Sequence, residues 1–277
     1  MSDRLIDRFG RAITYLRISL TDRCNLRCWY CAPAEGLKPL ARGALLSFEE
    51  IAEVTKTAAA LGVRKIRLTG GEPLLRRGIE TLTRMLASIP GIAELAMTTN
   101  GVLLADHAQS LADAGLQRVN ISLDTTDPEH YRELTGGGDI RRVLAGIKAA
   151  QAARLSPIKI NCVVSESSCE SDARDVASFA RRNGLEVRFI RRMNLAAGAF
   201  SVVEGGSGGD CKRCNRLRLS SDGIVRPCLF SDLGFSVREL GAARALEQAA
   251  REKPEAGKPC ARDGLAQRAG GIRGIGG

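Results

Sequence analysis

The stretch "ITYLRISLTDRCNLRCWYC" (residues 13–31) decides the fold of this chain. Its first part is rich in apolar and β-branched side chains, which predicts a β-strand over 13–20. Cys24, Cys28 and Cys31 follow that strand directly. Three thiolates leave one iron of a 4Fe-4S cluster open for a non-protein ligand, so we expect these cysteines to hold such a cluster. Zinc held by three thiolates and a water is a less natural alternative, because no histidine lies nearby.

A strand-then-helix pattern continues after these cysteines. Further strands are expected over 63–69, 93–99, 118–124, 157–164 and 185–190. The first helix begins with a capping box at Ser47 and Glu50 and stops at the glycine of "LGV" (61–63), and later helices are expected near 76–88, 105–114, 140–153 and 169–183. This alternation predicts an α/β fold, a partial (β/α)6 open TIM-like barrel followed by a C-terminal Fe-S cluster-binding extension. The site is expected at the carboxyl ends of the strands.

Composition narrows the class of protein. The 277 residues are 44% hydrophobic, and the sequence shows no leader and no apolar run near the ~20 residues of a membrane span, so we expect a cytoplasmic location and no membrane partner. Nine cysteines in a reducing compartment favour metal ligation or redox chemistry over disulfides. The net charge of +10 suits a phosphate-rich partner or plain solubility. With 4% aromatic residues and no stacking motif, a nucleic-acid partner is not expected.

A second cysteine set lies in "CKRCNRLRLSSDGIVRPCLF" (211–230), where Cys211, Cys214 and Cys228 again offer three thiolates. A zinc ribbon completed by Cys260 is the alternative. Cys162, Cys169 and Cys260 match no cluster pattern and are expected to be ordinary thiols. We expect a barrel over 1–193, a glycine-rich linker over 194–210, and a region over 211–277 with an auxiliary 4Fe-4S cluster and a C-terminal tail.

Two motifs together carry a family resemblance. The C-x3-C-x2-C spacing and "TGGEPLLR" (69–76) resemble the radical S-adenosylmethionine superfamily. With "CNRLRL", "RPCLF" and the terminal "IGG", the chain resembles the GTP 3',8-cyclase family, lyases that begin molybdenum cofactor biosynthesis. The resemblance implies two 4Fe-4S clusters, S-adenosyl-L-methionine, an electron donor and GTP as substrate, and a homodimer is possible. In that family a 5'-deoxyadenosyl radical removes the 3'-hydrogen of GTP, and the product is 3',8-cyclo-7,8-dihydro-GTP.

The resemblance also assigns roles to matching positions. No side chain is assigned as a catalytic acid, base or nucleophile. The cysteines of both sets are the expected cluster ligands. The glycines of the GGEP turn allow close approach of backbone to a ligand, and the glutamate offers an acceptor to an ammonium group. The positions expected to contact S-adenosylmethionine are Tyr30, Gly70, Gly71, Glu72, Ser122 and Met193. The positions expected to hold GTP are Arg17, Arg67, Thr98, Lys159, Arg216, Leu217 and Arg218.

The cationic members of this set have independent support, because guanidinium groups bind phosphate oxygens through paired hydrogen bonds and keep their charge. The resemblance further implies that Gly276 and Gly277 enter the active site, whereas a frayed terminus is the ordinary alternative.

The chain departs from the family at two places. Only 17 residues separate Met193 from Cys211, where the family carries a longer segment, and Arg191 and Arg192 replace an acidic and an apolar residue. Two other functions therefore stay open. One is a radical enzyme with an auxiliary cluster that acts on another nucleotide or a peptide, and the other is a non-catalytic zinc-binding protein.

Overall fold

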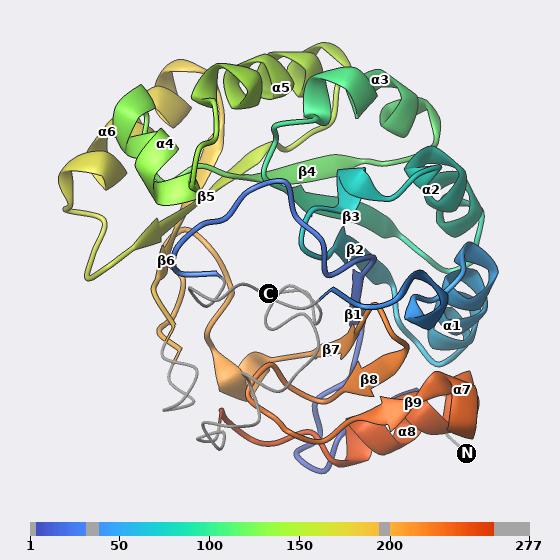
Figure 1. Cartoon of the computed structure of the whole chain (residues 1–277). Coiled ribbons are helices and arrows are strands. Elements are labelled where there is room, and N and C mark those ends of the chain that lie inside the picture. Colours follow the sequence, from blue (N-terminus) through green and yellow to red (C-terminus); the bar gives the residue numbers. More distant parts are fainter. Residues whose placement is uncertain (1–3, 32–38, 194–199, 258–277) are drawn as a thin grey trace.

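The computed structural model describes residues 4–31, 39–193 and 200–257 (Figure 1). Its strands belong to one sheet: β1 (Tyr15–Ser19), β2 (Lys65–Thr69), β3 (Glu94–Thr99), β4 (Arg118–Ser122), β5 (Lys159–Val164), β6 (Glu186–Arg191), β7 (Arg216–Leu219), β8 (Ile224–Arg226) and β9 (Phe235–Ser236). The α-helices are α1 (Phe48–Ala60), α2 (Ile79–Ala87), α3 (Leu104–Asp113), α4 (Pro128–Thr135), α5 (Ile140–Ala152), α6 (Ser171–Arg182), α7 (Val237–Leu240) and α8 (Ala242–Arg251). Short 3-10 helices are η1 (Arg42–Ala44), η2 (Pro73–Leu75) and η3 (Cys211–Arg213).

The sheet has the strand order β6-β5-β4-β3-β2-β1-β7-β8-β9. All pairs from β6 to β7 are parallel, and only β8 and β9 add antiparallel pairs at the edge. Figure 1 shows the sheet curving around a centre with α1, α2, α3, α5 and α6 on its outer side. The prediction of an α/β, partial and open barrel is confirmed.

The predicted elements coincide closely with the observed ones. The Ser47–Glu50 capping box is present at the start of α1, and Gly62 follows the helix with a left-handed φ of 97°. Helix α4 was not predicted, although Asp127 caps it and Pro128 occupies its first turn. The strands β7 to β9 were not predicted either, and β7 lies parallel to β1.

The two faces of the sheet differ in chemistry. Because pairing is in register, Arg17 of β1 lies between Arg67 of β2 and Arg218 of β7 on one face. The alternate residues Leu16 and Ile18 point to the other face, where both are 0% exposed in the hydrophobic core under the helices. The sheet therefore directs apolar side chains outward to the helices and cationic side chains to the centre of the barrel.

Part of the predicted linker lies along the edge of the sheet. Glu204 and Phe189 of β6 exchange backbone hydrogen bonds of 3.0 and 3.2 Å, and Val203 is buried. Residues 194–199 lie outside the described part of the chain. Within that described part, the longest helices, α1 and α5, have 13 residues each, and none meets the length and apolarity of a bilayer span.

Candidate active site

The GGEP turn (70–73) packs against the loop that carries Cys24, Cys28 and Cys31, here called the first cysteine loop. The backbone nitrogen of Gly71 donates to the carbonyl of Thr21 (2.7 Å), and that of Glu72 donates to Arg23 (2.8 Å). A Cβ on Gly71 would lie 2.2 Å from the Arg23 oxygen, and one on Gly70 would lie 2.6 Å from that of Thr21. Both glycines are therefore required for the approach of two chain segments at the end of β2, and this contact sets the position of the cysteine loop.

Glu72 joins that turn to the end of β3. Its carboxylate is 0% exposed and accepts hydrogen bonds from the Leu74 nitrogen (3.0 Å), the Thr99 hydroxyl (2.8 Å) and the Asn100 nitrogen (2.8 Å). Burial raises the pKa of Glu72 to about 7, against the opposing effect of these hydrogen bonds. The carboxylate thus holds the β2 and β3 ends together, while its predicted contact with an ammonium group stays a prediction.

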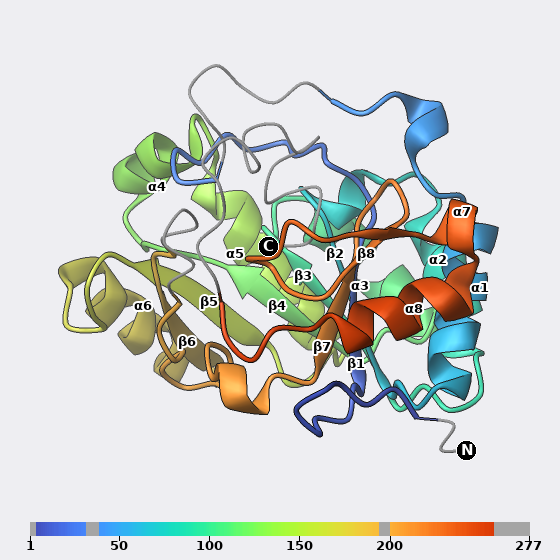
Figure 2. The same cartoon turned by 90° about the horizontal axis from the view of Figure 1, so that it is seen from below.

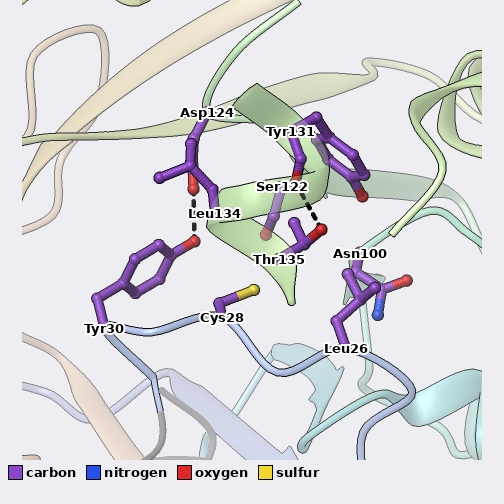
Figure 3. Close-up of a pocket in the computed structure, with 9 residues that line it drawn as sticks. All are labelled: Leu26, Cys28, Tyr30, Asn100, Ser122, Asp124, Tyr131, Leu134 and Thr135. Carbon is purple, nitrogen blue, oxygen red and sulfur yellow. Dashed lines mark hydrogen bonds between the residues drawn. The ribbon is translucent and has the colours of Figure 1, made fainter. Parts of the chain in front are cut away.

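A pocket lies beside the first cysteines (Figure 3). It is lined by Leu26, Cys28, Tyr30, Asn100, Ser122, Asp124, Tyr131, Leu134 and Thr135. The Tyr30 hydroxyl donates to Asp124 Oδ2 (2.5 Å), and the other oxygen of Asp124 accepts from the Val163 nitrogen (2.8 Å). Burial, and then the charge of Asp124, raise the pKa of Tyr30, so the phenol stays protonated and acts as a donor. Tyr30 and Ser122, both predicted cofactor contacts, are brought together here with Cys28.

The first cysteine set fits a cluster by the chemistry of its surroundings. Burial is the largest cause of the raised pKa values of Tyr30 and Tyr131, and nearby thiols add to it, Cys28 and Cys31 at Tyr30 and Cys28 and Cys24 at Tyr131. The Asn100 side-chain amide lies 3.7 Å from Cys24 Sγ, and such N–H donors to sulfur are typical of iron–sulfur ligands. Within the described residues, no three His, Cys, Asp or Glu side chains converge on a point as they do around a single metal ion.

The centre of the barrel carries a cationic surface above Tyr15. The guanidinium carbons of Arg67 and Arg216 lie 5.6 and 5.0 Å from the Tyr15 ring centroid. Burial and the neighbouring Arg216 lower the pKa of Arg218 to about 10, and burial and Arg218 lower that of Arg17. The arginines repel one another and so lower the stability of the fold, and an anionic ligand between them would reduce this repulsion.

Buried polar atoms line the same surface. In the described part of the chain, Arg67 Nε, Arg216 Nε and Thr98 Oγ1 are buried without a hydrogen-bond partner. Unsatisfied buried donors of this kind indicate a place where a ligand supplies acceptors. The predicted GTP positions on β1, β2, β3 and β7 are thus brought together.

Two residues that were predicted to hold GTP, Lys159 and Leu217, have side chains that are paired with another residue or point away from the barrel centre. The Lys159 ammonium contacts the carboxylate of Glu186, so a phosphate must compete with that ion pair. Leu217 is 0% exposed on the helix-covered face, which leaves its backbone as the part able to face the barrel centre. Arg188, which the sequence analysis did not single out, pairs with Asn161 on β5, and its Nε is also buried without a partner among the described residues. A charged residue at an inward-facing position of a strand is the sequence signal that could have identified Arg188.

The second cysteine set lies just before β7 and just after β8, and Figure 2 shows α8 running alongside these two strands. The Cys214 nitrogen donates to the Cys211 carbonyl (3.1 Å), and the Arg11 guanidinium donates to the same carbonyl (2.6 Å). Burial is the largest single effect on Cys214 and opposes its ionisation, but the charges of Lys253 and Arg216 and their hydrogen bonds together outweigh it, so the pKa of this thiol lies below its ordinary value. A thiol whose ionised form is favoured by two neighbouring cations fits a cluster ligand.

The remaining predicted positions lie around these two sets. Met193, like Cys228 of the second cysteine set, packs against Leu229 and Phe230. Among the residues at the end of β6, the Arg192 guanidinium carbon lies 5.1 Å from the Trp29 ring centroid, next to the first set, and Arg191 is exposed.

Three cysteines were expected to be ordinary thiols. Cys162 is 0% exposed and Cys169 is exposed, whereas Cys260 lies outside the described residues, as do Gly276 and Gly277. The eight cysteines in the described part of the chain form no disulfide.

Comparison with known proteins agrees with this geometry. The family model of the radical SAM superfamily matches residues 18–180. The chain is 40% identical to a GTP 3',8-cyclase of Geobacter sulfurreducens, covering 84% of this chain and 86% of that protein. The chain belongs to the GTP 3',8-cyclase family of the radical SAM superfamily. Another cyclase of this family, from Moorella thermoacetica, is 42% identical over 82% of this chain and 84% of its own length.

Solved structures share the fold at low sequence identity. Native anSMEcpe with bound AdoMet superposes with a TM-score of 0.64 at 16% identity, covering 87% of this chain and 81% of that one. Streptococcus suis SuiB bound to S-adenosylmethionine gives a TM-score of 0.62 at 15% identity, covering 89% and 66%. The alignment with the Geobacter cyclase spans 279 positions but uses only 84% of this chain, so that cyclase contains segments that this chain lacks.

Proposed function

We propose that this chain is a GTP 3',8-cyclase that converts GTP to 3',8-cyclo-7,8-dihydro-GTP, the first step of molybdenum cofactor biosynthesis. Family membership supports the reaction class. The observation that carries the substrate is the cationic surface on β1, β2 and β7, where Arg17, Arg67 and Arg218 lie in register on neighbouring strands. A triphosphate supplies the negative charge and the acceptors that such buried guanidinium groups require.

The two cysteine sets fit two 4Fe-4S clusters, one on either side of this cationic surface. Cys24, Cys28 and Cys31 would hold the first, which with S-adenosyl-L-methionine supplies a 5'-deoxyadenosyl radical. Cys211, Cys214 and Cys228 would hold the second. The remaining work of the chain is placement: the arginines hold the triphosphate, the Tyr30–Asp124 pair shapes the pocket beside Cys28, and the barrel limits access of water to the substrate.

The predicted roles of individual residues belong to this proposal. Tyr30, Gly71 and Ser122 lie at the first pocket or its loop, and Arg216 and Thr98 face the barrel centre. An external one-electron donor, a cytoplasmic location, a homodimer and the division into a barrel, a linker and an auxiliary-cluster region are proposed with it.

The test is an anaerobic assay on reconstituted protein with dithionite, S-adenosylmethionine and one nucleoside triphosphate at a time. GTP-dependent 5'-deoxyadenosine from protein that carries iron and acid-labile sulfide for two clusters is expected. Formation of 5'-deoxyadenosine with another nucleotide or a peptide but not with GTP would favour a different radical enzyme. A colourless zinc protein without activity would exclude the cyclase.

A further inference from the structure

Lys253 is a fully buried lysine that follows the last turn of α8. Its side chain lies among the largest with almost no exposure, and the residue is 2% exposed. Its ammonium group donates to the carbonyl oxygens of Arg216 (2.7 Å) and Pro227 (2.9 Å). The ammonium also interacts with the side chain of Cys214. At least two of its three N–H donors are therefore used.

These acceptors lie next to the second cysteine set. Arg216 begins β7 just after Cys214, and Pro227 directly precedes Cys228. One ammonium thus connects the two chain segments that carry these cysteines, and its charge acts on the thiols of both. Arg11 adds a further hydrogen bond to the first of these segments, at the Cys211 carbonyl.

The charge of Lys253 lacks a carboxylate counterpart. None of the ion pairs among the described residues includes it, and the charge of Arg11 acts on it with the same sign. A buried ammonium without a counter-charge is costly. Cys214 and Cys228 are the groups here that become negative, which they do when they bind iron as thiolates.

We propose that Lys253 is a positioning residue for the second cysteine set, where it fixes the spacing of Cys214 and Cys228 and balances the negative charge of a thiolate-bound cluster. This inference rests on the proposed function only in that the set holds a 4Fe-4S cluster. It does not depend on which substrate the enzyme uses. Hydrogen bonds and nearby charge set the reduction potential of such clusters, so the lysine has a measurable signature.

The experiment isolates the second cluster in the full chain by replacing Cys24, Cys28 and Cys31 with serine. In this background Lys253→Met removes the charge at similar length, Lys253→Arg keeps it, and Lys56→Met changes an exposed lysine on α1 as the control. Iron content, the electron paramagnetic resonance spectrum of the reduced cluster and its midpoint potential are measured after anaerobic reconstitution.

Lys253→Met is expected to shift the oxidised-to-reduced ratio at fixed potential at least tenfold toward the oxidised form, a change of about 59 mV for a one-electron couple. Loss of iron from this variant alone would support the proposal equally. Lys253→Arg and Lys56→Met are expected to keep the original potential and iron content.

Several results would overturn the inference. They are an unchanged potential with full iron in Lys253→Met, equal loss of iron in Lys253→Met and Lys253→Arg, and absence of a cluster from the unaltered background. If Lys253→Met does not fold by circular dichroism, Lys253→Arg decides: an unchanged potential supports a role for charge, and a tenfold shift contradicts it. Failure of the cyclase assay in the unaltered enzyme is a separate result, because these readouts need no turnover.

Discussion

The Tyr30 hydroxyl donates a 2.5 Å hydrogen bond to Asp124, and this contact connects the first cysteine loop to the end of β4. Tyr30→Phe leaves one oxygen of a buried carboxylate without its donor. We expect a loss of about 1–3 kcal/mol in the free energy of unfolding and weaker binding of S-adenosylmethionine. Denaturant unfolding and equilibrium binding to the reconstituted protein measure the two effects.

The matched control is Tyr131→Phe in the same pocket. The Tyr131 hydroxyl is buried without a hydrogen-bond partner among the described residues, so its removal should be neutral or slightly stabilising. Equal losses in both variants would show that the Tyr30–Asp124 contact has no special role.

Glu72 predicts a specific pH dependence of stability. Its pKa in the folded chain is about 7, above the ordinary value of 4.5, so folding favours the protonated form. Its stabilising contribution is therefore complete below about pH 4.5 and is lost as the pH rises through 7. Relative to Glu72→Gln, the unaltered chain should lose about 2 kcal/mol of unfolding free energy between pH 5.5 and 7. Urea unfolding of both proteins across this range checks the prediction, and parallel curves would refute it.

Gly71 makes a prediction about iron content. A methyl group there meets the Arg23 carbonyl at 2.2 Å, so Gly71→Ala must displace the first cysteine loop. We expect loss of iron from the first cluster with retention of the second. Gly43→Ala is the control, because an added Cβ there meets nothing within 4 Å. Full iron content in Gly71→Ala would show that the loop tolerates the displacement.

The buried arginines are expected to lower the stability of the fold while they strengthen the binding of GTP. Arg67 is 7% exposed, and its pKa is lowered by burial and by its neighbours Arg118 and Arg188. Arg67→Met should raise the free energy of unfolding by about 1–3 kcal/mol while weakening GTP binding at least about tenfold. Thermal unfolding with and without GTP measures both effects. Arg174→Met, at an exposed position of α6, should change neither, and a destabilised Arg67→Met would contradict the account.

Much of the fold could be predicted because the outward face of each strand is apolar and β-branched. Ile66 and Leu68 on β2, for example, are 0% exposed and give the strand a clear pattern. Strand β7 could not be predicted from this pattern. Its sequence "RLRL" places arginines toward the barrel centre and leucines under α8. Alternation of this kind does not show that the strand pairs with a parallel neighbour.

The candidate site was predictable where spacing along the chain carries the chemistry, as in the two cysteine sets. It was not predictable where distant segments supply the environment. Lys253 stands in "REKPE", which is typical of a solvated surface, and only the tertiary structure buries it against Arg216 and Pro227. The Asp124 partner of Tyr30 likewise depends on the approach of β4 to the cysteine loop.

The most direct test of the central claim uses GTP that carries deuterium at C3'. If this chain is a GTP 3',8-cyclase, anaerobic turnover should transfer the label to 5'-deoxyadenosine and yield a nucleotide product that is isomeric with GTP, both visible by mass spectrometry. Unlabelled 5'-deoxyadenosine together with unchanged GTP, from protein shown to carry both clusters, would contradict the account.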